Sequence, residues 1–319
     1  MVGYLGIDVG SVSTNLVATN DHNEIIASTY LRTQGQPIQA LQQGLVELQQ
    51  QLPPGFKVLG VGTTGSGRTL AGVVVGADIV KNEITAHAVA AASLVPNVQT
   101  VLEIGGQDSK IIILRDGVVT DFGMNTVCAA GTGSFMDHQA ERLGIPIAEF
   151  GNLALRATNP VRIAGRCTVF AESDMVHKQQ MGHKLEDIVA GLCEALVRNY
   201  LNNVGKGKDI LPPVVFQGGV AANAGIRTAF ERALGITVYV PQYYGVMGAW
   251  GAAILAREKV RGGAGTTKFR GFQIARLDYQ ASSFECQGCP NQCEVISITS
   301  EGNILARWGD RCGRWESML

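Results

Sequence analysis

Four of the seven cysteines stand close together near the C-terminal end, in a pattern typical of a metal site. Three lie in the run CQGCPNQC and the fourth in GDRCG; they are Cys286, Cys289, Cys293 and Cys312. Four thiolates with such spacing bind either a structural Zn²⁺ or a [4Fe–4S] cluster. The tail therefore predicts a metal site, and both metals remain candidates.

Two other cysteines, Cys128 and Cys167, have a different setting. Cys128 directly precedes an expected helix that ends at Gly144, where the helix dipole and free N–H groups stabilise a thiolate. A four-iron cluster needs four thiolates, so two subunits supplying two each would place it on a homodimer axis. Without their sequence contexts both would be interpreted as ordinary buried cysteines, the role that we expect for Cys193.

Three glycine-rich segments have the composition of phosphate-binding turns. The first is GIDVGSVS, in which Asp8 ends an apolar stretch. Backbone N–H groups of such a turn bind phosphate oxygens, and the carboxylate binds Mg²⁺, through water more readily than directly. The expected turn residues are Gly10, Ser11, Val12 and Ser13. Alone, this segment is equally compatible with an ordinary tight turn.

The second and third segments strengthen the interpretation. In IGGQD, the turn Gly105-Gly106 precedes Gln107 and Asp108, either of which can orient the water that attacks a γ-phosphate. The segment QGGVAAN has the form of a glycine bend over an adenine ring, with Gly218, Gly219 and Asn223 as its expected binding residues. Three such elements in this order match the actin, Hsp70 and sugar-kinase superfamily and predict ATP or ADP with Mg²⁺.

The elements that must position these residues occur twice. Residues 5–29 and 102–122 both read as strand, glycine turn, strand, tight hairpin, strand. We therefore expect an α/β, two-lobed, duplicated fold with the nucleotide in the cleft between lobes. Expected helices cover 37–51, 185–204, 223–234 and 247–260. The predicted domains are lobe I at 1–97, completed by helix 246–260, lobe II at 98–245, and a linker with the cysteine module at 261–319.

Bulk composition narrows the function classes. Lys plus Arg (26) nearly balance Asp plus Glu (27), so the charge favours neither nucleic acid nor an anionic membrane as a partner. The chain opens on a strand-like stretch, 2–9, with no signal-peptide pattern, and we expect a cytoplasmic protein. Cysteines in such a protein favour metal or redox chemistry over disulfides.

The motifs together resemble one known family over about residues 4–257. The runs that carry the resemblance are GIDVGS, GTTGSGR, IGGQDSK, CAAGTGSF, CTVFAES, QGGVAAN and GAWGAAI. They are similar to the 2-hydroxyacyl-CoA dehydratase activators, or archerases, of the BadF/BadG/BcrA/BcrD ATPase family. The resemblance implies a homodimer that shares one [4Fe–4S] cluster through Cys128 and Cys167, with ATP binding changing the angle between two cluster-bearing helices.

The same resemblance implies ATP-gated electron transfer. Reduced ferredoxin or flavodoxin would supply the electron, and a partner iron–sulfur enzyme would receive it. Candidate acceptors are a 2-hydroxyacyl-CoA dehydratase, a benzoyl-CoA reductase-type enzyme and a double-cubane cluster protein. Short activators lack the C-terminal cysteine module, which resembles that of longer activase-type proteins. Pro290 and the redox context favour a second [4Fe–4S] cluster there, with Zn²⁺ as the alternative.

Two other functions are compatible with parts of the pattern. A small-molecule kinase of the same superfamily would use a carboxylate, for which Asp108 is available, as the base for an acceptor hydroxyl. The cysteine runs occupy the second lobe, however, and no sugar-binding loop is evident. A non-enzymatic ATP-dependent sensor would bind nucleotide without transferring electrons.

Overall fold

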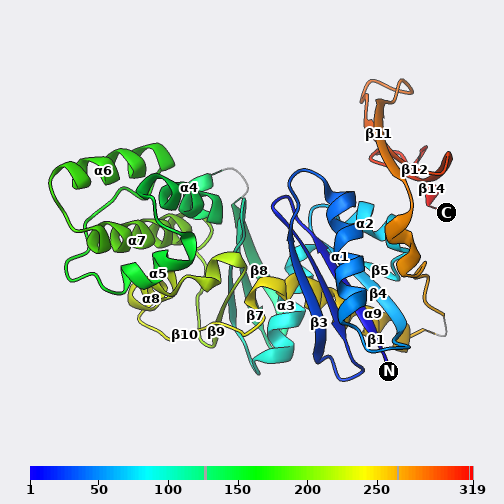
Figure 1. Cartoon of the computed structure of the whole chain (residues 1–319), viewed down its shortest axis with the longest axis horizontal. Coiled ribbons are helices and arrows are strands. Elements are labelled where there is room, and N and C mark those ends of the chain that lie inside the picture. The colour runs from blue at the N-terminus through cyan, green and yellow to red at the C-terminus, as the bar shows by residue number, and fades with distance from the viewer. Residues whose placement is uncertain (126–127, 264–265, 316, 319) are drawn as a thin grey trace. The chain divides into compact units, whose positions relative to one another are not determined.

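The computed structural model of the protein describes residues 1–125, 128–263, 266–315 and 317–318 (Figure 1). The chain divides into two compact units. One combines Met1–Glu83 with Gly248–Leu319, and the other is Ile84–Met247. Helix α3 (Glu83–Leu94), which precedes the expected lobe boundary at residue 97, belongs almost entirely to the second unit.

A five-stranded sheet of mixed direction forms the centre of the first unit. Strands β1, β2 and β3 are antiparallel neighbours, while β4 and β5 extend the sheet in parallel beyond β1, in the order β3-β2-β1-β4-β5. Parallel pairs need crossover connections; α1 lies in the connection that leads to β4, the parallel neighbour of β1, and α2 connects β4 to its parallel neighbour β5. The elements are β1 Val2–Val9, β2 Ser13–Thr19, β3 Ile25–Arg32, α1 Pro37–Gln51, β4 Lys57–Thr64, α2 Arg68–Val75, β5 Ile79–Val80 and α9 Met247–Arg261.

The central sheet of the second unit repeats this topology. Its order is β10-β9-β6-β7-β8, with β6, β7 and β8 antiparallel and β6, β9 and β10 parallel. The expected duplicated α/β fold is therefore confirmed. The strands are β6 Thr100–Ile104, β7 Ser109–Arg115, β8 Val118–Asn125, β9 Val214–Gln217 and β10 Val238–Tyr239; the further helices are α4 Gly133–Leu143, α5 Ile147–Ala154, α6 Thr168–Gln180, α7 Leu185–Asn203 and α8 Ala224–Leu234.

Apolar stripes on the helices build both cores, as their 3.6-residue periodicity predicts. In α1 the stripe Leu41, Leu45 and Leu48 is fully buried. Helix α7 buries most of its length, including Cys193, and burial raises the pKa of that thiol. Cys193 is thus a neutral core residue, as expected. No helix within the described residues is long and apolar enough to span a membrane.

Helix α9 lies against β1 and β4 at backbone distance. A Cβ atom added at Gly6 would overlap the carbonyl oxygen of Ala249, and one at Gly62 would overlap that of Ala252. Only glycine on the strands and small residues on the helix permit this approach. The small-residue run of α9 is therefore a packing requirement of the first sheet.

The C-terminal segment forms a four-stranded antiparallel sheet of its own. Its strands are β11 Tyr279–Glu285, β12 Glu294–Ser300, β13 Asn303–Trp308 and β14 Ser317–Met318, in sequential order. A tight hairpin connects β12 to β13 around Glu301. Glu301 and Gly302 both have positive φ (51° and 80°), the backbone that a tight two-residue hairpin turn requires.

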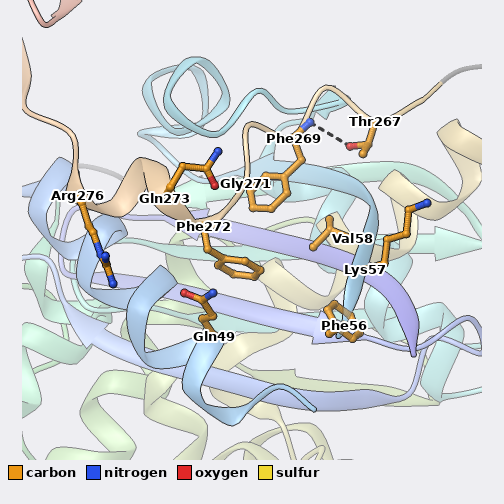
Figure 2. Close-up of a pocket in the computed structure, with 10 residues that line it drawn as sticks. All are labelled: Gln49, Phe56, Lys57, Val58, Thr267, Phe269, Gly271, Phe272, Gln273 and Arg276. Atoms are coloured by element: carbon orange, nitrogen blue, oxygen red, sulfur yellow. Dashed lines mark hydrogen bonds between the residues drawn. The ribbon is translucent and has the colours of Figure 1, made fainter. Parts of the chain in front are cut away.

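The segment before this sheet packs on the first unit. Asp78 accepts hydrogen bonds from Thr267 Oγ1 (2.7 Å) and from the backbone N–H of Lys268 (2.8 Å). Beyond it, Phe269 and Phe272 cover α1 and β4 and line a pocket of ≈ 580 Å³ together with Phe56 (Figure 2). Tyr279 and Ile298 also join the apolar core of the first unit. The cysteine-bearing sheet is thus continuous with this unit at its near end.

Substitution of Gly6 by alanine tests the approach of α9 to β1. The new Cβ would overlap backbone atoms of Ala249 and Ala253, so the helix must move. We expect Gly6→Ala to lower the unfolding free energy by about 3 kcal/mol. Urea denaturation followed by circular dichroism measures it. Gly263→Ala is the matched control, because its Cβ would meet only an ordinary contact. Equal stability of the two variants would contradict the packing argument.

A buried histidine joins α3 to the end of β9. His87 Nδ1 lies 2.7 Å from Gln217 Nε2, and both side chains are buried. Burial, with a smaller contribution from the charge of Lys110, lowers the pKa of His87 to about 3. In the unfolded chain the imidazole titrates near its ordinary value of 6.5. Acid therefore favours unfolding, because the unfolded state binds a proton at His87 that the native state does not bind.

The pH dependence of stability follows from this difference. Below pH 6.5, and down to about pH 3, His87 should lower the unfolding free energy by about 1.4 kcal/mol per pH unit. Removing the imidazole in His87→Gln should remove that slope. Denaturation at several pH values between 7.5 and 5 compares the variants, with the exposed His22→Gln as control. Parallel pH profiles for wild type and His87→Gln would rule out this coupling.

Candidate functional site

The first glycine turn joins β1 to β2 and is open to solvent. Gly10 N–H donates to Ser13 O (2.9 Å), and Thr33 secures the turn by donating from its N–H to Val12 O (2.8 Å) and from Oγ1 to Gly10 O (2.9 Å). Ser11 is exposed, and Gly10, Val12 and Ser13 are half-buried. The predicted turn thus exists, with a fixed backbone and an accessible surface.

Asp8 lies near the end of β1, beside the turn at Gly65–Gly67, for which the sequence analysis proposed no role. Gly67 N–H donates to Val9 O (2.8 Å), and a Cβ at Gly65 would lie 2.5 Å from Asp8 Oδ1. Gly65 has φ +92°, so glycine is needed there on two counts. Since β1 and β4 are parallel, their ends meet at one edge of the sheet, and the GTTGSGR run closes this edge next to Asp8.

The second glycine turn has the same backbone geometry as the first. Gly105 N–H donates to Asp108 O (3.0 Å), as Gly10 does to Ser13. Below it, Lys110 Nζ lies 2.9 Å from Asp108 Oδ2 and 3.2 Å from Glu103 Oε2, with only 4% of its side chain exposed. Sequence reasoning missed Lys110, whose only signal is a charged residue inside the apolar strand SKIIIL. Gln107 remains exposed on the turn.

The third element lies next to the second within the same unit. A Cβ at Gly218, which has φ +89°, would meet Ile104 O and Glu103 Oε1. Gly219 begins a short 3₁₀ turn, and Asn223 Oδ1 accepts a hydrogen bond from Ile226 N–H (3.1 Å) as the N-cap of α8. The structure therefore brings Gly218 to the second turn, and gives Asn223 a capping role.

Both predicted cluster cysteines precede helical turns. Cys167 is the N-cap residue of α6, and Cys128 precedes a 3₁₀ turn, Ala129–Gly131, that leads into α4. Asn125 holds Cys128 by accepting its N–H (2.9 Å) and donating to its carbonyl (2.7 Å). Both thiols are half-buried, unlike that of Cys193, so each is accessible from outside the chain.

Helix α4 begins directly on the second glycine turn. Gly133 N–H donates to Gly105 O (2.8 Å), and Ser134 donates from its N–H (2.8 Å) and from Oγ (2.5 Å) to Gly106 O. A Cβ at Gly133 would lie 2.9 Å from Gly105 O, so this contact also depends on glycine. The segment that carries Cys128 is thus attached to the predicted phosphate-binding turn.

A cationic groove of ≈ 870 Å³ lies beside Cys167. Its ionisable lining residues are Arg162, Arg166, Asp174, His177, Lys178 and Arg198. Arg198 donates to Ile163 O (2.6 Å), and burial lowers the pKa of its guanidinium. The excess of cations favours negative charge nearby, such as thiolates or an acidic protein surface.

The four tail cysteines gather at one end of the C-terminal sheet. Cys286 N–H donates to Cys293 O (2.8 Å), and Cys286 Sγ accepts from Trp315 Nε1 (3.1 Å) and from Gly288 N–H (3.4 Å). Cys289 and Cys312 are exposed. Within the described residues, no three Cys, His, Asp or Glu side chains are close enough together to bind a metal. The tail metal site stays a prediction.

Comparison with known proteins places this geometry in context. A model of the BadF/BadG/BcrA/BcrD ATPase family matches residues 5–256. The (R)-2-hydroxyglutaryl-CoA dehydratase activating ATPase of Acidaminococcus fermentans is 36% identical over 263 residues, which are 80% of this chain and 97% of that protein.

Solved structures of dehydratase activators have a fold similar to that of this chain. Component A of the Acidaminococcus fermentans dehydratase aligns with a TM-score of 0.76 at 34% identity, over 82% of this chain and 100% of that one. The activator of 2-hydroxyisocaproyl-CoA dehydratase from Clostridium difficile, with bound ADPNP, gives 0.73 at 31%, over 81% and 96%. A ROK family glucokinase from Streptomyces griseus, at 13% identity and a TM-score of 0.50, shares the fold alone.

The tail beyond residue 256 lies outside the family match, whereas both glycine turns, the QGGVAAN segment, Cys128 and Cys167 lie inside it. The two activator structures align with 81–82% of the chain at 31–34% identity. The chain belongs to the BadF/BadG/BcrA/BcrD ATPase family.

Proposed function

We propose that the protein is the activating component of a partner iron–sulfur enzyme, to which it transfers one electron at the expense of ATP hydrolysis. The observation that carries the proposal is the direct attachment of the Cys128 segment to the second glycine turn, through Gly133 and Ser134. A change at the phosphates would act on a cluster ligand through these few hydrogen bonds. Relatives named as dehydratase activators, one with bound ADPNP, support it.

Nucleotide handling divides among the three turns. The N–H groups of Gly10 and Gly105 close the two turns by donating to Ser13 O and Asp108 O, and the N–H groups of Ser11, Val12 and Gly106 on these turns bind phosphate oxygens. Asp8 holds Mg²⁺, and Gln107 orients the attacking water. Asp108 Oδ2 lies 2.9 Å from Lys110 Nζ, and the role of Asp108 is to fix the conformation of the turn. Gly218 and Gly219 provide a flat surface for adenine. Asn223 supports this surface by capping the N-terminus of α8.

Cys128 and Cys167 fit a cluster shared between two copies of the chain. Each copy offers two half-buried thiols at helix N-termini, where thiolate charge is stabilised. Two copies supply the four ligands that a [4Fe–4S] cluster needs, which makes the functional form a homodimer. The cluster, when bound, accepts and releases one electron. The protein's own residues fix the ligands and connect them to the nucleotide turn.

The C-terminal cysteines fit a second metal site. N–H donors from Trp315 and Gly288 already point at Cys286 Sγ, as they do at metal-bound thiolates. Cys289, Cys293 and Cys312 complete the ligand set, with [4Fe–4S] preferred over Zn²⁺. At this site an iron–sulfur cluster would receive electrons from ferredoxin or flavodoxin.

The partners follow from the same proposal. The acceptor is a 2-hydroxyacyl-CoA dehydratase, a benzoyl-CoA reductase-type enzyme or a double-cubane cluster protein, and the reaction belongs in the cytoplasm. The cationic groove beside Cys167 favours an acidic surface on a protein that approaches the cluster.

A sugar-type kinase is the alternative of the same fold. Its base would be Asp108, but this carboxylate is paired with a lysine whose side chain is only 4% exposed. A base in such an ion pair is poorly suited to accept a hydroxyl proton. The geometry therefore favours the activator.

Metal analysis of Cys128→Ala tests the shared cluster. We expect about twelve irons per anaerobically purified wild-type dimer, falling to about eight in the variant as the shared cluster is lost. About four irons with about two zinc ions, and none of the iron in the variant, would instead assign Zn²⁺ to the tail. Cys193→Ala is the matched control. Iron content indifferent to Cys128 would refute the shared cluster.

Asp8→Asn tests the nucleotide site. Replacing the carboxylate by an amide of the same shape weakens Mg²⁺ binding, and we expect ATP hydrolysis to fall on the order of a hundredfold. ADP binding without Mg²⁺ should persist. Phosphate release and fluorescence titration measure the two quantities, and Asp116→Asn, in the β7–β8 turn, is the control. Undiminished hydrolysis in Asp8→Asn would remove Asp8 from the site.

A further inference from the structure

One buried amide on α7 contacts the segments of both predicted cluster cysteines. Asn199, only 2% exposed, donates from Nδ2 to the carbonyl of Gly165 (2.6 Å) and to Cys128 Sγ at the longer distance of 3.9 Å. Gly165 stands two residues before Cys167. Two ligands that lie far apart in the sequence are thus attached to a single side chain.

The backbone of both segments rests on the same face of α7. A Cβ at Gly131 would lie 2.7 Å from Asn199 Oδ1, and one at Gly165 would lie 2.7 Å from the carbonyl of Ala195. Ala195 and Asn199 are four residues apart and therefore neighbours on one helix face. A side chain at either glycine would separate its segment from α7, so the close approach that lets Asn199 contact both segments depends on these two glycines.

The hydrogen-bonding capacity of the Asn199 amide goes mostly to these two segments. Its oxygen accepts from Asn203 Nδ2 (3.0 Å), and its two N–H groups face Gly165 O and Cys128 Sγ. Burying an amide is costly unless its groups are paired. A core helix position that needed only volume would carry an apolar residue, as its buried neighbours Leu196 and Val197 do.

We propose that Asn199 positions Cys128 and Cys167 relative to each other and sets the reduction potential of the cluster that they share. This inference rests on the function proposed above. Asn199 touches one ligand sulfur directly and the other ligand through the Gly165 carbonyl. It is a positioning residue, since it supplies no ligand and transfers no electron itself.

The effect on the potential has a definite sign. An N–H group that donates to a ligand sulfur withdraws negative charge and stabilises the reduced, more negative cluster. Loss of this donor therefore makes reduction less favourable. A symmetric dimer contains two such contacts, one from each copy of Asn199.

Three variants separate the donor from its surroundings. Asn199→Ala removes the amide, and Asn199→Asp keeps its shape but replaces the donor by a carboxylate. Asn202→Asp is the matched control, because Asn202 is an exposed residue on the same helix beside the same groove. It introduces an equal charge without touching either cysteine segment.

Two measurements report on the proposal. In the iron-loaded dimer, a redox titration followed by electron paramagnetic resonance should show the equilibrium constant for one-electron reduction falling about tenfold in both Asn199 variants, or about 59 mV. In iron-free protein, iodoacetamide should alkylate Cys128 and Cys167 about threefold faster or more in Asn199→Ala, because both segments loosen. Alkylation of the exposed Cys289 serves as the internal reference.

Each contrary outcome has its own meaning. Equal potential shifts in Asn199→Asp and Asn202→Asp would assign the effect to charge alone and overturn the proposal. Unchanged potentials and unchanged alkylation rates in Asn199→Ala would overturn it as well. If wild-type protein holds no iron at Cys128, the shared cluster fails, while the alkylation rates still decide whether Asn199 holds the two segments.

Discussion

A lysine buried beneath the second glycine turn is paired with two carboxylates, and the turn and helix α7 both contact it. Lys110 carries its charge into a site with 4% side-chain exposure, which is tolerable because Glu103 and Asp108 lie on either side of it (3.2 and 2.9 Å). Removing one partner of such a group leaves a buried charge uncompensated, so the three residues hold one another in place. Asp108 in turn fixes the turn on which α4 begins.

Two routes lead from this ion pair toward the cysteines. One runs through the carbonyls of Gly105 and Gly106, which accept hydrogen bonds from Gly133 and Ser134, and so to the segment of Cys128. The other runs through Tyr200, whose hydroxyl donates to Lys110 O (2.6 Å). Tyr200 lies on α7 directly after Asn199. The second glycine turn, the Cys128 segment and Asn199 therefore belong to one connected set of contacts within the second unit, which is what the proposed coupling requires.

The duplicated sheets place different chemistry at equivalent positions. Asp8 pairs across the strands with Asn15, whereas its counterpart Glu103 pairs with Lys110. Asn15, like Lys110, is buried. In the first copy the carboxylate thus faces an amide, and in the second an ammonium group. A carboxylate opposite a neutral amide is suited to bind a metal cation. A carboxylate opposite a lysine is already paired with a positive charge and is suited to a structural role.

Motif spacing was sufficient for the duplicated fold and for the turns at Gly10 and Gly105, because tight turns depend on local residue types. Contacts that arise from tertiary packing were not predictable in this way. Lys110 reads as an ordinary strand residue, and Asn199 as a polar residue on an amphipathic helix. Their roles depend on which segments fold over them. The same holds for Asn223, whose capping role depends on where α8 begins.

The C-terminal sheet shows why its cysteines need a further partner. At its near end, Tyr279 and Ile298 join the core of the first unit. Six of the seven residues of β11 are exposed. At the cysteine end Val295 is buried, and Phe284 packs against Trp315 (centroids 5.1 Å apart) with Arg307 over both rings. A small sheet with one face exposed has a limited apolar core, and small modules of this kind are commonly stabilised by a disulfide or a metal. Four free cysteines in the segments at this end, with N–H groups of Trp315 and Gly288 directed at the sulfur of Cys286, favour the metal.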